Sequence, residues 1–476
     1  MSTPWLLTLP AELLADISSR FCPHCVGDSG LYLDLGSSER YDQLASQQRD
    51  LASLSRTSRE IHAVATPFLY HLFATHQSTL YLHMRLQRTL YERPDLAAHV
   101  RRAAFVGYTN PAETDSVVNH LVARLKVPPP EGWIVPKKVM IVTKTGNRVE
   151  SVREPLRHQF LVEMALNLTA GLEHLSMNLS LHASEDYGKN MLPSSTLPAL
   201  RTLHLAHSYP AGFSLEVVSR LLQKAPNLRL LTLDGCSSVR YGSSPGPDLS
   251  NLSALRLVRP CFRENAHLAG LFASCSKLQG LAFHHWRGES YIYLPRRTPR
   301  ELIQALLPCN QTLRYLEIQW AEDDDIYQDE LVRSLKPFSS LETLVIDAAC
   351  IYSNRTRDVE ESEPPSSLAD LLPTSIRYLL LWRVNLRMHQ DLADFAQKAR
   401  RGAFPNLKEV WISWVPADAS LSQMMIWALE EDLQLAGISI RSLPYSKVEF
   451  FLDSEALLRE DFSLHIPERS LQSTSP

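Results

Sequence analysis

The chain has 476 residues, of which 45% are hydrophobic and 21% are charged, and its formal net charge is −4. This is the composition of an ordinary folded protein, and it excludes a chain that is disordered throughout. The small negative charge gives no reason to expect nucleic acid as a partner. Because 476 residues exceed what one compact core usually holds, we expect several domains or an open-ended stack of repeats.

The start of the chain does not have the pattern of a secretory signal. Residues 1–17 contain Glu12 and Asp16 and lack both a basic beginning and a long apolar run. No stretch of the sequence reaches the length that crosses a membrane. The seven cysteines, an odd number scattered along the chain, favour reduced thiols in an intracellular compartment, either cytoplasm or nucleus.

Residues 1–75 predict a helical head. Helical spacing of mostly apolar residues predicts its first two helices. The first contains Leu13, Leu14 and Ile17, and the second contains Leu51, Leu54, Ser58 and Ile61. A third helix is predicted over residues 67–73. Residues 22–48 contain several glycines and serines and predict an irregular insertion between the first two helices.

Residues 76–168 predict a helical linker followed by a first, irregular repeat. Residues 80–90 have helical spacing, and Val100, Ala103 and Phe105 form a weakened copy of the phrase that recurs further along. Residues 108–154 interrupt this pattern as a second insertion. Within it we expect a hairpin that pairs residues 139–142 with residues 148–152.

Residues 169–415 repeat one short phrase nine times: an apolar residue, two others, an apolar residue, one other and an apolar residue. The copies begin at Leu172, Leu200, Leu228, Leu252, Leu278, Leu313, Leu341, Ile376 and Leu407. Their starts lie 24 to 35 residues apart, which is room for one strand and one helix. No unit could bury its apolar face alone, so the units must stack.

Segments with helical spacing join the predicted strands. They are residues 215–223, 266–273, 300–307, 330–335, 367–372 and 391–400. Parallel strands need such crossovers, so the predicted fold is α/β, a solenoid with a curved parallel sheet inside and helices outside. Residues 416–476 are predicted to form a C-terminal cap and polar tail, with a helix over residues 421–433 and an apolar run over residues 438–443.

Side chains alternate along each predicted strand, so the residues between the apolar positions should face the open side of the sheet. The large aromatic residues at these positions are Tyr315, Tyr378, Trp382 and Trp411. Tyrosine and tryptophan are enriched at binding hot spots. We therefore expect them to recognise a target protein, unless a flanking segment such as the C-terminal tail covers them.

The sequence assigns no catalytic residue, metal or cofactor. It contains neither G-x-x-x-x-G-K-[ST] nor G-x-G-x-x-G, so a phosphate-binding loop lacks support. Cys22-Pro-His-Cys25 has the spacing of half a zinc site, but no second pair with matching spacing follows. The fold would have to bring in His24, His62 or His71. The sequence therefore predicts an ordinary reduced cysteine pair in a loop.

The repeats resemble leucine-rich repeats of the longer, irregular kind. The Asn or Cys that usually follows in the turn is clear only as Cys236. The resemblance thus covers the stack of strands and helices and does not extend to a regular turn.

The head resembles the F-box, a helical module of roughly 50 residues with which ubiquitin-ligase receptors dock on a Skp-type adaptor. Residues 9–17, LPAELLADI, match the opening phrase L-P-x-E-L-L-x-x-I without a gap. Leu51, Leu54, Ser58, Arg59 and Ile61 match the second phrase, and residues 65–70 are similar to the sequence that often closes such modules in fungal proteins. The sequence departs from the pattern in its insertion at 22–48 and at Thr57, where Val is common.

This resemblance implies a set of adaptor-binding residues. They are Leu9, Pro10, Glu12, Leu13, Leu14, Ile17, Leu51, Leu54, Ser58, Arg59 and Ile61. A protein that docks through an amphipathic helix leaves some apolar side chains uncovered by its own fold. The alternative is that these residues form only the core of a helical cap on the repeat stack.

Together the two resemblances imply a non-enzymatic substrate-recognition subunit of an SCF-type ubiquitin ligase. Its partners would be a Skp-type adaptor within a cullin ligase complex and a target protein, with no nucleic acid and no membrane. One alternative is a repeat-based interaction scaffold without a ligase role. A third is an enzyme whose site is assembled from residues that sequence alone does not associate.

Overall fold

The computed structural model describes residues 9–26, 38–75, 80–105, 138–143, 146–151, 162–179, 196–207, 212–238, 248–262, 264–285, 297–320, 326–352, 367–385, 388–414 and 429–443. The chain forms two compact units. The first comprises residues 1–209, 213–228 and 241–248, and the second comprises residues 210–212, 229–240 and 249–476. The domain boundaries predicted at residues 75, 168 and 415 stay predictions.

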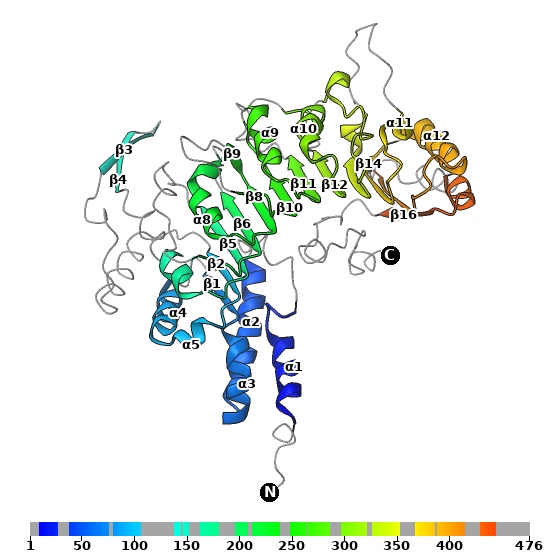
Figure 1. Cartoon of the computed structure of the whole chain (residues 1–476). Helices are drawn as coiled ribbons and strands as arrows, with labels where there is room; N and C mark the ends of the chain where they lie inside the picture. Colours follow the sequence, from blue (N-terminus) through cyan, green and yellow to red (C-terminus); the bar gives the residue numbers. More distant parts are fainter. Residues whose placement is uncertain are drawn as a thin grey trace. The chain divides into compact units, whose positions relative to one another are not determined.

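Three helices open the first unit and pack against one another (Figure 1). They are α1 (Ala11–Phe21), α2 (Ser38–Ser55) and α3 (Arg59–Leu69). The predicted second helix is in fact broken, because Ser58 begins a new one: its Oγ accepts a hydrogen bond from the backbone N–H of Ile61 at 3.1 Å. Leu51 and Leu54 therefore lie on α2, whereas Ile61 lies on α3.

Two further expectations for the head are corrected. The insertion predicted over residues 22–48 is not irregular throughout, because α2 begins at Ser38, after the last of its glycines, Gly36. Residues 38–50 contain neither Gly nor Pro, so nothing prevents the helix from starting early. The third helix ends at Leu69, and Leu72–Thr75 form strand β1, which pairs with β2 (Arg102–Phe105) instead of extending the helix.

The sheet of the first unit contains four parallel strands in the order β1, β2, β5 (His174–Leu179) and β6 (Thr202–His207). Ala103 pairs with Leu175, which pairs with Leu203. The weakened phrase at Ala103 and Phe105 therefore is a strand in register with the full copies. The predicted hairpin is also confirmed, because β3 (Lys138–Thr143) and β4 (Gly146–Ser151) pair antiparallel.

The remaining elements of the first unit precede or follow these strands. They include α4 (Leu80–Glu92), α5 (Pro94–Ala97), β7 (Phe213–Ser214), η3 (Leu215–Val218) and α8 (Ser219–Lys224), and residues 162–168 are also helical. The helices predicted over residues 80–90 and 215–223 are thus confirmed, the latter with a 3₁₀ first turn.

The second unit contains eight parallel strands, which pair in chain order. They are β8 (Leu230–Asp234), β10 (Ala254–Val258), β11 (Gly280–His285), β12 (Tyr315–Trp320), β13 (Thr343–Asp347), β14 (Tyr378–Val384), β15 (Glu409–Trp414) and β16 (Ser439–Leu443). Copies of the apolar phrase lie in register: Leu255 pairs with both Leu231 and Leu281. The equivalent leucines are fully buried, so the repeated phrase forms one continuous apolar layer.

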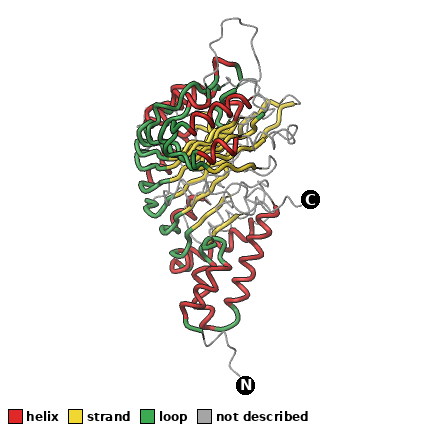
Figure 2. The backbone as a smooth tube through the Cα atoms, turned by 90° about the vertical axis from the view of Figure 1, so that its right-hand side faces the viewer, coloured by secondary structure: helices red, strands yellow, loops and turns green. Residues whose placement is uncertain are grey.

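Helices and loops cover one face of this sheet (Figure 1, Figure 2). The helices are α9 (Asn265–Ala273), α10 (Pro299–Ala305), α11 (Leu368–Leu371) and α12 (His389–Arg400), with 3₁₀ turns η5 (Leu307–Cys309), η6 (Gln328–Glu330) and η7 (Ala348–Cys350) and a short strand β9 (Cys236–Ser238). Thr298 begins α10 with a capping box, in which Glu301 returns a contact to the Thr298 backbone. The large parallel sheet with flanking helices makes the protein α/β, as predicted.

The helix predicted over residues 330–335 is wrong. Only the short turn η6 forms there, and the following backbone is not helical. The N–H of Val332 donates to the carbonyl oxygen of Cys350 at 2.9 Å, and the N–H of Leu335 donates to that of Leu371 at 2.8 Å. These groups bond to neighbouring repeats, so they are not available for a helix.

Two parts of the segment predicted as a C-terminal cap lie in described residues. The apolar run at residues 438–443 contains β16, which pairs in parallel with β15. Residues 429–435 are helical, and Gly437 with a φ of +74° follows them. The rest of the predicted helix at 421–428 and the tail at 444–476 lie outside the described residues.

Candidate functional site

Helix α1 presents apolar side chains to solvent. Leu13 is 50% exposed and Phe21 is 41% exposed, and Ile17, four residues from each, is half-buried. Residues four apart lie on the same face of a helix, so these three form one stripe. We call Leu13, Ile17 and Phe21 the α1 stripe.

A neighbouring face of α1 packs into the core of the head. Leu14 packs there with Cys22, Leu51, Ile61 and Ala65, all buried. Leu9 and Leu54 border this cluster and are partly buried. Leu13 and Leu14, adjacent in sequence, thus have different roles because successive helical residues point about 100° apart.

The structure therefore divides the residues predicted to bind an adaptor into three groups. Pro10, Glu12, Leu13 and Arg59 are exposed; Leu9, Ile17, Leu54 and Ser58 are half-buried; Leu14, Leu51 and Ile61 are buried. The buried group holds the head together. Phe21 was not among the predicted residues, although its spacing of four from Ile17 could have identified it.

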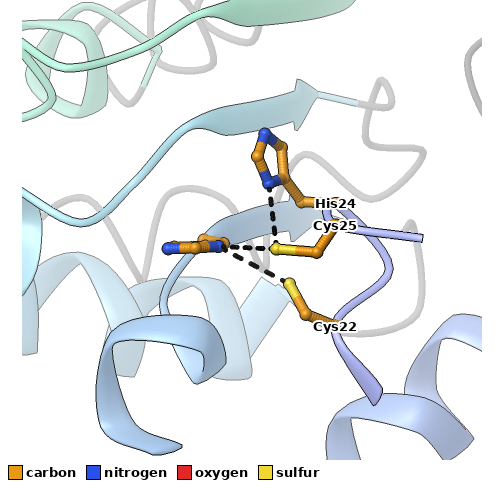
Figure 3. A group of neighbouring side chains, drawn as sticks. Cys22, His24 and Cys25 are labelled. Carbon is orange, nitrogen blue, oxygen red and sulfur yellow. Dashed lines mark hydrogen bonds between the residues drawn. The ribbon is translucent and has the colours of Figure 1, made fainter. Parts of the chain in front are cut away.

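A second group of side chains gathers where α1 ends. Cys22 caps the helix, and the following turn is closed by the N–H of Cys25, which donates to the carbonyl oxygen of Cys22 at 3.0 Å. His71, which lies between α3 and β1, approaches this turn from a distant part of the sequence. Figure 3 shows Cys22 and Cys25 with their sulfur atoms turned toward the same region and His24 beside Cys25. We call Cys22, His24, Cys25 and His71 the Cys/His cluster.

The distances within the Cys/His cluster are short. Nδ1 of His71 lies 3.7 Å from Sγ of Cys22 and 3.4 Å from Sγ of Cys25. Nδ1 of His24 lies 3.6 Å from Sγ of Cys25. One ligand atom from each of the four residues lies within 4.8 Å of all the others. The sequence offered His24, His62 and His71 as further ligands but predicted an ordinary cysteine pair, because His71 is 46 positions beyond Cys25 and local spacing does not bring them together.

The two thiols influence each other. The hydrogen bond with Cys25 lowers the pKa of Cys22 to about 3, against the opposing effect of burial, and His24 and His71 lower it further. The same contact with Cys22 is the main cause that raises the pKa of Cys25, and burial adds to it. The pair therefore favours one thiolate and one thiol. All seven cysteines lie in described parts of the chain, and none of them forms a disulfide there.

The aromatic residues predicted for target recognition lie in the second unit. Two of them were expected to face solvent but are buried. Tyr315 is 6% exposed and Trp411 is 3% exposed. They belong to one buried apolar cluster along the sheet: Leu230, Ala254, Ala282, Tyr315, Val345, Leu380 and Trp411. Side chains in neighbouring strands stand about 4.8 Å apart, so large residues in this layer pack against each other. Tyr378 and Trp382 keep partial exposure, and Trp382 packs against the edge of the cluster.

A buried carboxylate lies beside these aromatic residues. Glu317 is 0% exposed and accepts hydrogen bonds from the Tyr315 hydroxyl at 2.9 Å and from Nε2 of Gln319 at 2.7 Å. Its Oε1 also lies 2.8 Å from Nε2 of His284. Burial lowers the pKa of His284, which Glu317 partly opposes. The network thus joins a neutral histidine to a carboxylate that three side chains stabilise.

Comparison with known proteins adds no family. No protein-family model matches the sequence, and no curated protein sequence matches it. Across the described parts of the chain, no helix combines the length and the apolar character needed to cross a membrane.

Proposed function

We propose that this protein is the substrate-recognition subunit of an SCF-type ubiquitin ligase. In this proposal the head is an F-box that docks on a Skp-type adaptor, and the second unit is a leucine-rich-repeat-like arc that holds a target protein. The chain itself performs no chemistry. It contributes proximity and orientation for ubiquitin transfer by the other subunits.

The observation that carries the proposal is the α1 stripe. The F-box opening phrase at residues 9–17 coincides with a helix whose apolar residues divide between a core face and an exposed face. Apolar side chains that remain exposed on one face of a helix are suited to binding a partner. A helical cap that served only its own fold would have no need of the stripe.

The target surface is assigned to the side of the sheet that helices leave open. Tyr378 and Trp382 are the contact candidates because both keep accessible surface. Trp382 packs against the buried cluster that contains Tyr315 and Trp411. Partly exposed aromatics above a well-packed layer fit the anatomy of a binding hot spot.

The test is adaptor binding by the full-length chain with Leu13→Asp and Phe21→Asp together. We expect the double variant to lose binding to a purified Skp-type adaptor in a pull-down assay, because two charges replace the apolar contact. Leu435→Asp is the matched control, since Leu435 is 61% exposed in the second unit. It should bind as the unchanged chain does.

Circular dichroism of each variant keeps the result interpretable. Both variants alter exposed side chains, so both should retain the native spectrum. Failure of the unchanged, folded chain to bind the adaptor contradicts the proposal and favours the alternative of an interaction scaffold without a ligase role. Unchanged adaptor binding by a folded double variant contradicts the assignment of the docking surface to the α1 stripe. Turnover of any substrate by the purified chain alone would instead favour an enzyme.

A further inference from the structure

The Cys/His cluster offers a full set of ligands for one metal ion. Structural zinc sites use four ligands from cysteine and histidine in tetrahedral geometry. A tetrahedral zinc ion bonded at about 2.3 Å to sulfur and about 2.0–2.1 Å to nitrogen places those ligand atoms about 3.6 Å apart. Three of the four sulfur–nitrogen distances in the cluster are 3.4, 3.6 and 3.7 Å, and all four ligand atoms lie within 4.8 Å of one another. These three distances are thus close to those that zinc would require.

The backbone holds the ligands in place. The turn after α1 fixes Cys22 and Cys25, through the N–H groups of Cys25 and Val26, which both donate to the Cys22 carbonyl oxygen at 3.0 and 3.1 Å. The carbonyl oxygen of His71 accepts from the N–H groups of Arg101 and Arg102 at 3.0 and 2.9 Å. The loop and the sheet therefore each position part of the ligand set before any ion binds.

The surroundings provide an outer partner for one ligand. One ligand atom each of His24, Glu173 and His174 lie within 4.8 Å of one another. Histidines that bind metals usually direct their second ring nitrogen to a carboxylate or another acceptor. Glu173 stands where it can serve His24 in this way.

We propose that the Cys/His cluster binds one zinc ion, which ties the end of α1 to the beginning of β1. Two thiolates neutralise the charge of the ion, and the thiolate and imidazole ligands suit zinc better than magnesium or calcium, which prefer oxygen. The ion stabilises the head, because Cys22 belongs to its buried core and His71 precedes the first strand of the sheet. This role is independent of the docking function proposed above.

The experiment measures metal in the full-length chain, purified under reducing conditions and supplied with zinc. We expect about one zinc ion per chain by elemental analysis, and a tetrahedral cobalt spectrum with thiolate charge-transfer bands when Co²⁺ replaces zinc. Cys25→Ser and His71→Gln should each remove the thiolate bands or the bound metal. The loss of affinity should exceed the roughly 10- to 100-fold effect of losing an outer partner.

Cys25 is the informative position because it is exposed, so its replacement should leave the fold intact. Cys261→Ser and His62→Gln are the matched controls: Cys261 donates to the carbonyl oxygen of Arg259 at 3.2 Å, a bond that serine can keep, and His62 is exposed on α3. Both controls should retain the metal.

Two results would overturn the proposal. One is a folded chain, purified under reducing conditions, that binds neither zinc nor cobalt at one equivalent, whether Cys22 and Cys25 are thiols or have formed a disulfide. The other is metal that remains bound with unchanged affinity in both Cys25→Ser and His71→Gln.

Discussion

Nδ1 of His71 lies 3.4 Å from Sγ of Cys25, although 46 positions separate the two residues in the sequence. This contact joins the loop after α1 to the residue before β1. If the cluster holds zinc, a chelator should loosen both segments while the second unit is unaffected. Hydrogen exchange should show faster exchange at residues 19–26 and 68–72 after chelation, and equal rates at residues 254–258. If chelation leaves the exchange rates of all three segments unchanged, the ion has no structural role.

Leu13 and Leu14 should differ sharply in their effect on stability. Leu14→Ala removes buried methyl groups from the core of the head and should destabilise it by about 2–5 kcal/mol. Leu13→Ala changes a half-exposed side chain and should alter stability by less than about 0.5 kcal/mol. Urea unfolding of both variants measures the difference. Equal losses would mean that α1 is turned differently about its axis.

Two arginines with left-handed backbone form ion pairs that differ in burial. Arg259 (φ +48°) pairs with Asp234, and Arg383 (φ +54°) pairs with Asp347. The side chains of the first pair are 39% and 17% exposed, and those of the second are 11% and 1% exposed. Arg383→Met leaves the buried Asp347 carboxylate without its arginine, so it should lower the free energy of unfolding by about 3–5 kcal/mol.

Arg259→Met should cost no more than about 1 kcal/mol, since water reaches the first pair. Both variants keep a non-glycine residue at positive φ, so backbone strain is the same in both. The difference between their losses of stability therefore reports the cost of leaving the more deeply buried carboxylate without its arginine. Thermal unfolding monitored by circular dichroism would detect it. A smaller effect for Arg383→Met than for Arg259→Met would contradict this reading of the two pairs.

The protein should lose stability as the pH falls below about 6.5, in part through His284. Burial lowers the pKa of His284 in the folded state, against the attraction of Glu317 and Asp234, and Arg256 lowers it further. The unfolded chain therefore binds the proton more readily. Stability from this group is present above the unfolded pKa and falls by up to about 1.4 kcal/mol per pH unit below it.

His284→Gln removes the titrating group and keeps a donor for Glu317. The unfolding midpoint of this variant should depend less on pH between about 7.5 and about 5.5 than that of the unchanged chain. Parallel pH profiles for the two proteins would show that His284 does not titrate as its surroundings imply.

Tyr315→Phe should destabilise the second unit by about 1.5–3 kcal/mol, because it removes a hydrogen bond to the buried Glu317 carboxylate. Tyr378→Phe, two strands away in the same row, is the control at a half-buried tyrosine. It should change stability by less than about 0.5 kcal/mol. Denaturant midpoints of the two variants provide the test, and similar values would refute a special role for Glu317.

The amino-acid sequence by itself determined the parallel sheet and the helical opening of the chain. The apolar phrase around Leu255 recurs often enough that neighbouring copies can bury each other only in register, as Leu231 and Leu281 do. The spacing of Leu13, Leu14 and Ile17 was sufficient to predict helix α1, because helical periodicity is a local property of the sequence.

Only the tertiary structure decided which residues meet and which remain exposed. Alternation placed Tyr315 and Trp411 on the open side of the sheet, but their burial depends on how neighbouring side chains fill that layer. Likewise, the Cys22–Cys25 loop suggested only half a metal site until the path of the chain brought His71 beside it. Contacts of this kind are set by distance in space, which a pattern of local spacing does not contain.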